Sequence, residues 1–274
     1  MLACRHDAMS TIIGGPDSDR PLHTEEAEET NEKEEGCIRI VQYNVGVFYK
    51  SGSSSLNMVA DMMKELQADV ISLNEVDSVT ARTGRVDQIK AFASLMGNWN
   101  YRYAFAMPYN GGKYGIGVCA SPELNYIRGH VVHLPKAGGG EDRALGVMEF
   151  DDFIVATTHI DLSTGAQSPQ IDAINAFFNG VYQNETKPIF LCGDFNNKPG
   201  SETINEMIKT WKILTPQNPT APAINPRSCI DYIFCRPGSA NVQVVKTRIC
   251  KQFDNGDVTI ASDHLPVYVD IKLL

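Results

Sequence analysis

Apolar residues along the chain follow two patterns, continuous β-branched runs and runs with helical spacing. Residues 37–48, CIRIVQYNVGVF, are apolar and β-branched, which predicts a buried strand. Over residues 55–68 the apolar side chains recur every three or four positions, which predicts a helix. Residues 69–76, DVISLNEV, form a second apolar run. The chain is therefore expected to open as strand, helix and strand.

The rest of the chain continues this mixture, with strands more numerous than helices. Helices are expected at 87–97, 168–182 and 201–211. Strands are expected at 101–107, 114–121, 126–134, 187–195, 229–235, 241–250 and 265–273, with a hairpin over 144–160 that turns at Asp151 and Asp152. Many strands with helices between them indicate two packed sheets covered outside by helices.

The charge of the chain is concentrated near its start. Of the formal net charge of -9, residues 1–36 contribute -7, from ten acidic and three basic side chains, which leaves -2 for residues 37–274. The stretch PLHTEEAEETNEKEEG has few large apolar residues, a composition that predicts disorder. We therefore expect a disordered acidic N-terminal tail over 1–36 and one domain over 37–274. The nearly neutral domain could attract nucleic acid only through a local basic patch.

Other features bear on the compartment. No apolar run reaches the roughly 18 residues of a membrane span, so no stable membrane insertion is expected. The seven cysteines show no zinc-like spacing and mostly lie in apolar runs, which favours buried free thiols over disulfides. The opening MLAC is a weak hint of a clipped lipoprotein signal. Cytoplasmic and exported locations are both left open, and a monomer is expected.

Polar residues that a strand core would not favour stand at the ends of several apolar strands, inside one of them and just before the last. These residues are Asn44, Glu75, His159, Asp194, Asn196, Asp231, Asp263 and His264. Singly, each has an ordinary structural explanation, such as a turn, an exposed strand end, a core histidine or a loop cap. A buried carboxylate is costly unless it is paired or metal-bound, so the set together favours a functional site.

The residue types indicate a class of chemistry. Oxygen atoms of Asn, Glu and Asp suit a hard cation such as Mg²⁺, or Mn²⁺. An Asp that orients a His is the usual arrangement for general acid or base work. No serine or cysteine lies in a GxSxG turn, which argues against covalent acyl chemistry.

At these residues the sequence resembles the endonuclease/exonuclease/phosphatase superfamily, the DNase I-like metal-dependent phosphohydrolases, over nearly all of residues 37–274. The matching segments occur in the family's order and approximate spacing: VQYNV, LNEVD, TTHIDL, CGDFNNKPGS, CIDYIF and ASDHLPVYVDI. The resemblance implies an α/β fold, a four-layer sandwich of two packed, mostly antiparallel sheets flanked by helices. It also implies one metal-centred cleft formed by strand ends and loops.

The resemblance implies roles at the metal and the water. Glu75 would be the main Mg²⁺ ligand, with Asn44 contributing and Asp263 close by. Asp194 would orient or deprotonate the attacking water, and Asn196 would hold the phosphate or the water.

The other matching positions imply acid–base and substrate-binding roles. His264 would be held by Asp231 and would contact the phosphate or act as an acid–base group. His159 would stabilise the developing phosphorane or assist the leaving group, so the division of labour between the two histidines is open. Arg143 matches a position where a basic residue often follows an acid, and it is expected to contact substrate, with a solvated loop charge as the alternative.

The sequence departs from the family pattern at several places. Asn74 stands where the family commonly has Gln. Ile116 replaces an Asn that can contact substrate, which puts phosphate-side contacts there in doubt. Residues 220–222, Thr-Ala-Pro, replace a Thr followed by an aromatic, so one cleft wall would be more open. The segment 75–88, with Arg82, either selects substrate or leads into the next helix.

These observations predict a Mg²⁺-dependent phosphoester hydrolase whose water is activated by the metal and an Asp. The substrate would be a phosphodiester or phosphomonoester, either of a small molecule or of nucleic acid, because this fold serves several substrate classes. One alternative is a DNA or RNA endonuclease with a patch from Lys113, Arg143, Lys198 and Arg227. A second alternative is a catalytically silent binding module. The physiological substrate and the number of metal ions do not follow from the sequence.

Overall fold

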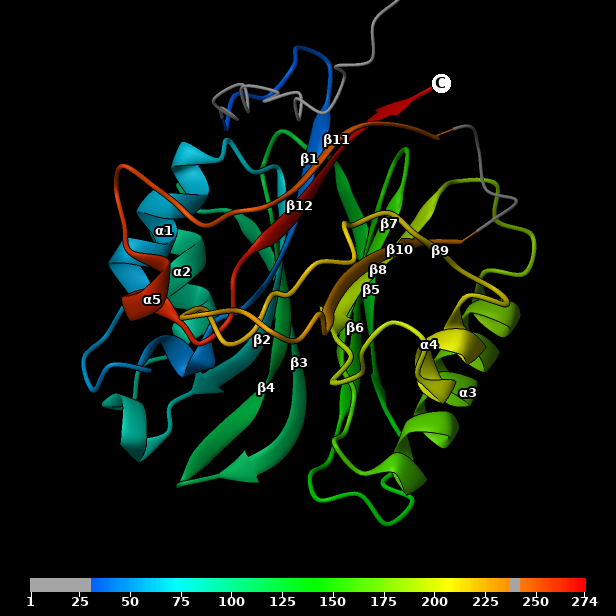
Figure 1. The fold of residues 1–274 in the computed structure, drawn as a ribbon, viewed down its shortest axis with the longest axis horizontal. Helices are drawn as coiled ribbons and strands as arrows, with labels where there is room; N and C mark the ends of the chain where they lie inside the picture. Colours follow the sequence, from blue (N-terminus) through cyan, green and yellow to red (C-terminus); the bar gives the residue numbers. More distant parts are fainter. Residues whose placement is uncertain (1–30, 237–241) are drawn as a thin grey trace, which may run out of the picture. The chain divides into compact units, whose positions relative to one another are not determined.

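Two six-stranded sheets lie face to face in the computed structural model, and helices cover the outer face of each (Figure 1). The structure describes residues 31–236 and 242–274, and Glu32–Leu274 form one unit. The predicted tail falls largely outside the described residues, so its disorder and its boundary at residue 36 stay predictions. No helix in the described part is long and apolar enough to cross a membrane.

The first sheet has the strand order β11-β12-β1-β2-β4-β3. Its strands are β1 (Ile38–Asn44), β2 (Val70–Ser78), β3 (Asn100–Tyr109), β4 (Gly112–Ala120), β11 (Val242–Ile249) and β12 (Val267–Leu273). Its helices are α1 (Leu56–Glu65), α2 (Gln88–Leu95) and α5 (Val258–Ala261). Strands β1 and β2 are parallel because α1 carries the chain back between them.

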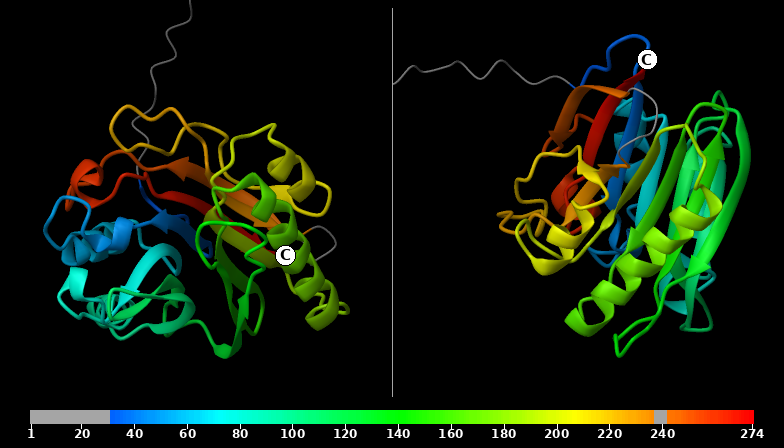
Figure 2. Two further views of the ribbon diagram at one scale, coloured as in Figure 1. Left: turned by 90° about the horizontal axis from the view of Figure 1, so that it is seen from below. Right: turned by 90° about the vertical axis from the view of Figure 1, so that its right-hand side faces the viewer.

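The second sheet has the strand order β5-β6-β7-β8-β10-β9. Its strands are β5 (Tyr126–His133), β6 (Ala144–Phe150), β7 (Ile154–His159), β8 (Ile189–Asp194), β9 (Lys212–Ile213) and β10 (Asp231–Cys235). Helices α3 (Thr164–Val181) and α4 (Glu202–Met207) lie outside it, as the two views of Figure 2 show. Here β7 and β8 are the parallel pair, joined through α3, and the other pairings of both sheets are antiparallel.

Three apolar layers hold these four layers of structure together. One lies between the first sheet and its helices and includes Phe48 and Phe92. One lies between the second sheet and its helices and includes Phe178 and Trp211. The third, between the two sheets, includes Phe190. Each large buried side chain stabilises the fold by roughly 1.5–3 kcal/mol relative to exposure, so the apolar runs of the sequence set the layering. The predicted α/β sandwich is confirmed.

The structure differs from the predicted elements at a few boundaries. The first strand ends at Asn44, and Gly46–Phe48 form a 3-10 turn where a longer strand was expected. Helix α3 starts at Thr164 rather than 168, so Pro169 lies further inside the helix than the second position that was expected. Helix α4 stops at Met207. The short elements β9 and α5 were not predicted, because two to four residues give no periodic signal.

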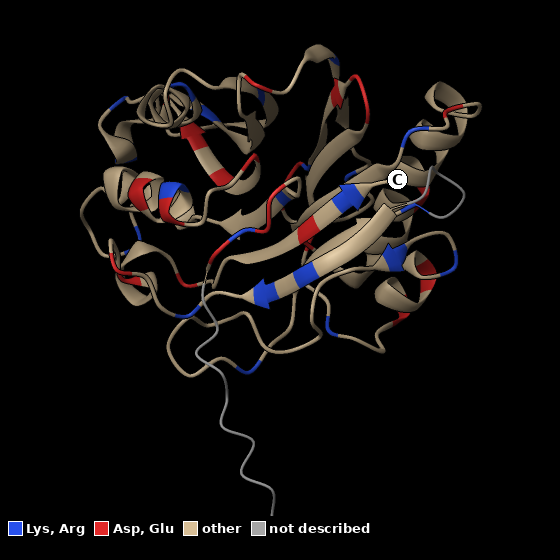
Figure 3. Cartoon of the chain, turned by 90° about the horizontal axis from the view of Figure 1, so that it is seen from above, with Lys and Arg blue, Asp and Glu red and all other residues tan. Residues whose placement is uncertain are grey.

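On the side of the molecule drawn in Figure 3, basic and acidic positions intermingle, so no face there carries charges of one sign.

One ion pair of the first sheet is fully buried: Arg39 on β1 donates from Nε to Asp270 Oδ1 at 2.6 Å and from a second nitrogen to Oδ2 at 2.7 Å. The guanidinium also lies over the Tyr268 ring, 4.0 Å from its centroid. This bidentate geometry makes the burial of both charges tolerable.

Candidate active site

Strand register brings the predicted polar residues to one end of the sandwich. Across the second sheet, His159 on β7 and Asp231 on β10 are both the direct partners of Asp194 on β8. Across the first sheet, Asn44 on β1 is the partner of Asn74 on β2. The polar end of each strand is therefore aligned with the polar end of the next.

A cleft of about 750 Å³ opens at this end. Its lining combines acidic, basic, histidine and tyrosine side chains, namely Glu75, Arg82, Met107, Tyr109, Tyr114, Gly140, Glu141, Arg143, His159, Asp161, Leu162, Ser163, Asp194, Asn196 and His264. Six of the predicted site residues are in this lining. Asn44 and Asp231 lie buried behind it, and Asp263 lies outside the lining.

Asp194 is the centre of the arrangement. Its Oδ2 lies 3.6 Å from Nε2 of His159 and 3.6 Å from Nε2 of His264, so one carboxylate oxygen faces both rings. The same oxygen accepts a hydrogen bond of 3.0 Å from Asn44 Nδ2. Burial raises the pKa of Asp194, and the positive charge of His264 opposes that rise. The carboxylate is therefore a base whose proton affinity depends on its neighbours.

His264 is held in one orientation by Asp231. Its Nδ1 lies 2.8 Å from Asp231 Oδ2, which also accepts a 2.6 Å hydrogen bond from Thr220 Oγ1. Burial by itself lowers the pKa of His264, but the negative charges of Asp231 and Asp194 outweigh it and raise the pKa to about 10. His264 is thus an imidazolium at neutral pH, with Nδ1 directed to Asp231 and Nε2 to Asp194.

His159 has the opposite protonation. Asn196 Nδ2 donates to Ile160 O at 2.8 Å and lies 3.1 Å from His159 Nε2, so the amide nitrogen faces the ring and Nε2 accepts. Burial, with the nearby cations Arg143 and His264, lowers the pKa of His159 well below its usual value. The two histidines therefore differ: His264 carries the charge and His159 is neutral. The φ of +51° at Asn196, in the left-handed region that Asn tolerates, aims this amide.

Glu75 reaches the cleft through an irregularity in β2. Between Leu73 and Val76 the pairing with β4 is shifted, so Asn74 and Glu75 stand opposite the single residue Ile116. Glu75 adopts a φ of +55°, costly for a residue with a Cβ, and this turns its side chain out of the strand alternation. Its Oε1 accepts a 3.1 Å hydrogen bond from Asn44 Nδ2.

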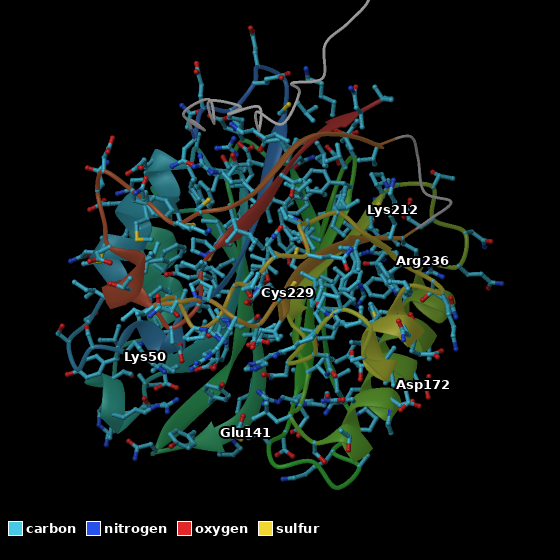
Figure 4. All side chains as sticks on the ribbon, viewed as in Figure 1. Lys50, Glu141, Asp172, Lys212, Cys229 and Arg236 are labelled. Carbon is cyan, nitrogen blue, oxygen red and sulfur yellow. The ribbon has the colours of Figure 1, made fainter. Side chains whose placement is uncertain are left out.

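Asn44 and Asp263, the other two predicted metal ligands, already have partners. Asn44 Oδ1 accepts from the Gly46 amide at 3.1 Å, while its nitrogen bridges Glu75 and Asp194. Asp263 forms an ion pair with Lys50, which lowers the pKa of Asp263 although burial opposes it. Figure 4 labels Lys50 at the left flank of the molecule, below its middle. The ligand roles of both residues stay predictions.

The loop and strand residues noted in the sequence are divided between the cleft and the core. Arg143 is buried and lines the cleft, with one guanidinium nitrogen 3.1 Å from Glu141. Arg82 lines it too, held by two hydrogen bonds to the buried Asp77. Ile116 on β4 instead packs in a small apolar cluster with alanines of β3 and β6, so it makes no polar contact of the kind an Asn could make.

A buried polar layer, of which only Asn74 was named from the sequence, fixes the two sheets to each other. Asn74 Oδ1 accepts from Gln42 Nε2 and from the Asp194 amide, both at 2.7 Å, and its Nδ2 donates to Thr158 O at 2.9 Å. Ser72 Oγ donates to Gln42 Oε1 and lies 2.7 Å from Thr157 Oγ1. The available signal was a polar residue in the middle of an apolar strand, as in VQYN and ISLN.

Three of the buried side chains are close enough together to ligate one metal ion. Asp194, Asp231 and His264 offer ligand atoms that all lie within 4.8 Å of one another. Two of them already share the 2.8 Å contact between Asp231 and His264. Glu75, by contrast, is a partly exposed cleft carboxylate that pairs with no Lys or Arg of the described residues.

Comparison with solved structures found the same fold in several proteins. The mannosyl-6-phosphatase of Bacteroides thetaiotaomicron VPI-5482 is 14% identical with a TM-score of 0.69, over 85% of this chain and 99% of that one. An endonuclease/exonuclease/phosphatase of Beutenbergia cavernae DSM 12333 is 22% identical with a TM-score of 0.67, over 86% and 72%. The human Nocturnin catalytic domain, with bound sulfate, is 17% identical with a TM-score of 0.66, over 87% and 94%.

Comparison with sequences gave a family but no individual relative. No curated protein matched the chain. The model of the family described as "Endonuclease/Exonuclease/phosphatase family" matches residues 41–264, which run from β1 to His264 and include every predicted site residue. The chain therefore belongs to the endonuclease/exonuclease/phosphatase family.

Proposed function

We propose that this protein is a metal-dependent phosphoester hydrolase that uses the cleft around Asp194. The observation that carries the proposal is the position of Asp194 Oδ2, 3.6 Å from the Nε2 atoms of a neutral His159 and a cationic His264. A base and a proton donor on one small site are what hydrolysis of a phosphate ester requires. Membership of a family named for nucleases and phosphatases supports the same chemistry.

The residues present fit a hard cation at Glu75. Its carboxylate lines the cleft, has no cationic side chain as partner in the described chain, and is oriented by Asn44. Oxygen donors of this type suit Mg²⁺, or Mn²⁺. When bound there, the cation would supply positive charge to the phosphate. Asp263 fits less well, because Lys50 already neutralises it.

Different side chains would carry out the two proton transfers of hydrolysis. A water oxygen forms a bond to phosphorus and the bond from phosphorus to the leaving oxygen breaks. The proton of the water passes to Asp194, and His264 Nε2 donates a proton to the leaving oxygen or a hydrogen bond to the phosphate. Asp231 keeps His264 charged, whereas His159 and Asn196 contact each other beside Asp194. Arg143, buried in the wall, would contact the substrate.

The test is hydrolysis of p-nitrophenyl phosphate and bis-p-nitrophenyl phosphate with Mg²⁺, with Mn²⁺ and with EDTA, beside supercoiled plasmid. We expect metal-dependent cleavage of a small ester that falls by about a hundredfold or more in Asp194→Ala. The matched control is Asp172→Ala, an exposed Asp on α3 that does not line the cleft and that Figure 4 labels away from the cleft residue Glu141. Nicked plasmid would favour the endonuclease alternative, and no hydrolysis of any substrate would favour the binding module.

Metal binding is tested separately from activity. Titration of Mn²⁺ into the protein, followed by the electron paramagnetic resonance of free Mn²⁺, counts sites and measures affinity. Glu75→Gln should weaken binding by about tenfold or more, while Asp263→Asn should change it by less than about threefold. Glu123→Gln, an exposed substitution of the same type, is the control. Equal losses in the Glu75 and Asp263 variants would show that both carboxylates are ligands.

A further inference from the structure

The loop between β5 and β6 forms one wall of the cleft and is firmly anchored. The Leu134 amide donates to Arg143 O at 2.9 Å and closes the base of the loop. The buried Asp161 accepts from the amides of Gly140 at 3.4 Å and Glu141 at 3.2 Å. A Cβ at Gly139 would stand 2.9 Å from the Asp161 carboxylate, so glycine is required for this close approach. The loop therefore holds Glu141 and Arg143 at fixed positions.

Arg143 has an unfilled hydrogen-bonding requirement. Its side chain is 5% exposed, yet Nε hydrogen-bonds to none of the described residues. Asp161 Oδ2 lies 3.7 Å from this Nε atom, beyond hydrogen-bonding distance. A buried N–H without an acceptor is costly. Because Arg143 lines the cleft, a ligand oxygen can supply that acceptor.

The same wall presents carboxylates to the ligand. Glu141, which is paired to Arg143 at 3.1 Å, keeps 44% of its side chain exposed, and Asp161 lies behind it. A carboxylate beside a guanidinium suits hydroxyl groups, because a hydroxyl both donates and accepts hydrogen bonds. A second phosphate at this position would meet the negative charge of Glu141. Figure 4 labels Glu141 near the lower ends of β3 and β4.

The opposite wall lacks the features of a nucleic-acid groove. Polynucleotide binding uses basic residues along the backbone and open aromatic faces for the bases. Among the described residues, the cleft lining contains no lysine, and Arg82 is neutralised by Asp77. The guanidinium of Arg82 covers the Tyr109 ring at 4.2 Å from its centroid, so that face is closed to a base. Lys113, Lys198 and Arg227, the patch considered in the sequence, do not line the cleft.

We propose that Glu141 and Arg143 form a subsite for hydroxyl groups, so that the substrate is a phosphate ester of a small polyhydroxylated molecule, a sugar or polyol. This inference rests on the proposed hydrolase function and adds the substrate class. Glu141 then acts as a specificity-determining residue. It accepts hydrogen bonds from substrate hydroxyls and repels flanking phosphates.

The experiment measures kcat/KM for phosphate esters of glycerol and of a hexose, and compares each with kcat/KM for the p-nitrophenyl monoester or diester that matches it. An oligonucleotide is tested as a third kind of substrate. The wild type should prefer the polyol esters. In Glu141→Gln the ratio of polyol to p-nitrophenyl kcat/KM should fall by about tenfold, mostly through a higher KM, because a hydrogen bond to a charged acceptor is lost. Asp142→Asn is the matched control, since Asp142 pairs with Lys136 and does not line the cleft.

The outcomes separate this inference from the function on which it rests. A wild type that cleaves p-nitrophenyl esters but not polyol esters, or that prefers the oligonucleotide, would overturn the subsite and leave the hydrolase. So would an equal loss on both substrates in a folded Glu141→Gln protein. No cleavage of any ester would refute the hydrolase function and the subsite together. The wild-type preference needs no variant, so the inference stays testable if the substitution prevents folding.

Discussion

Asn74 provides the sharpest test of how the active site is supported. It lies on β2 in the first sheet, is fully buried, and accepts a 2.7 Å hydrogen bond from the amide of Asp194 in the second sheet. It also accepts from Gln42 Nε2 at 2.7 Å and donates to Thr158 O at 2.9 Å. Asn74→Ala would remove all these bonds at once and leave the partners inside the protein.

The size of the effect follows from the groups left behind. Gln42 keeps a longer 3.4 Å contact to Asp231. The Asp194 amide and the Thr158 carbonyl oxygen, however, each lose the hydrogen bond that Asn74 makes to them. Each buried group without a partner costs about 1–3 kcal/mol, so we expect a loss of about 3 kcal/mol in the free energy of unfolding. That is a large share of the roughly 5–15 kcal/mol typical of a domain.

Urea denaturation followed by circular dichroism measures this loss as a lower midpoint at unchanged slope. Asn57→Ala, an exposed substitution of the same type on α1, should stay within about 0.5 kcal/mol of the wild type. Because Asn74 positions Asp194, the rate of ester hydrolysis should also fall under conditions where the variant is folded. A destabilisation below about 1 kcal/mol would refute the reasoning, since the freed groups would then have found other partners.

Two further predictions concern buried charges. Arg39→Ala would leave the Asp270 carboxylate buried without its bidentate partner, so urea denaturation should show a loss of about 3–5 kcal/mol in the free energy of unfolding. Lys33→Ala, which breaks the more exposed pair with Asp69, should cost less than about 1 kcal/mol. Similar losses in the two variants would contradict the argument. Asp231→Asn removes the charge that, with Asp194, raises the pKa of His264 to about 10 against the effect of burial. In the wild type the stabilisation from this pair is complete below the unfolded pKa of about 6.5 and is lost as pH rises towards the folded pKa. In the variant, the His264 ring should titrate at lower pH in an NMR experiment and hydrolysis should decline from a lower pH, whereas an unchanged titration would show that Asp231 does not control the charge.

The sequence by itself determined the sandwich and the identity of its polar strand ends. The continuous apolar runs are excluded from water only in strands that are buried on both faces. The helical spacing of residues 55–68 gives one apolar stripe, which required a helix packed on an outer face of a sheet. Asn44, Asp194 and Asp231 stood out because each interrupts or ends an apolar run where water is excluded. Their order along the chain, matched to a family, supplied the expected chemistry.

Only the tertiary structure decided how those residues interact. The bulge at Asn74 and Glu75, the pairing of Asp263 with Lys50, and the different charges of His159 and His264 each depend on residues far apart in the chain. Local periodicity reports burial but not which side chains meet across two sheets. Electrostatic interactions and hydrogen bonds act over a few ångströms in space, so the partner of a polar residue is set by the packing of the sheets rather than by its neighbours in sequence.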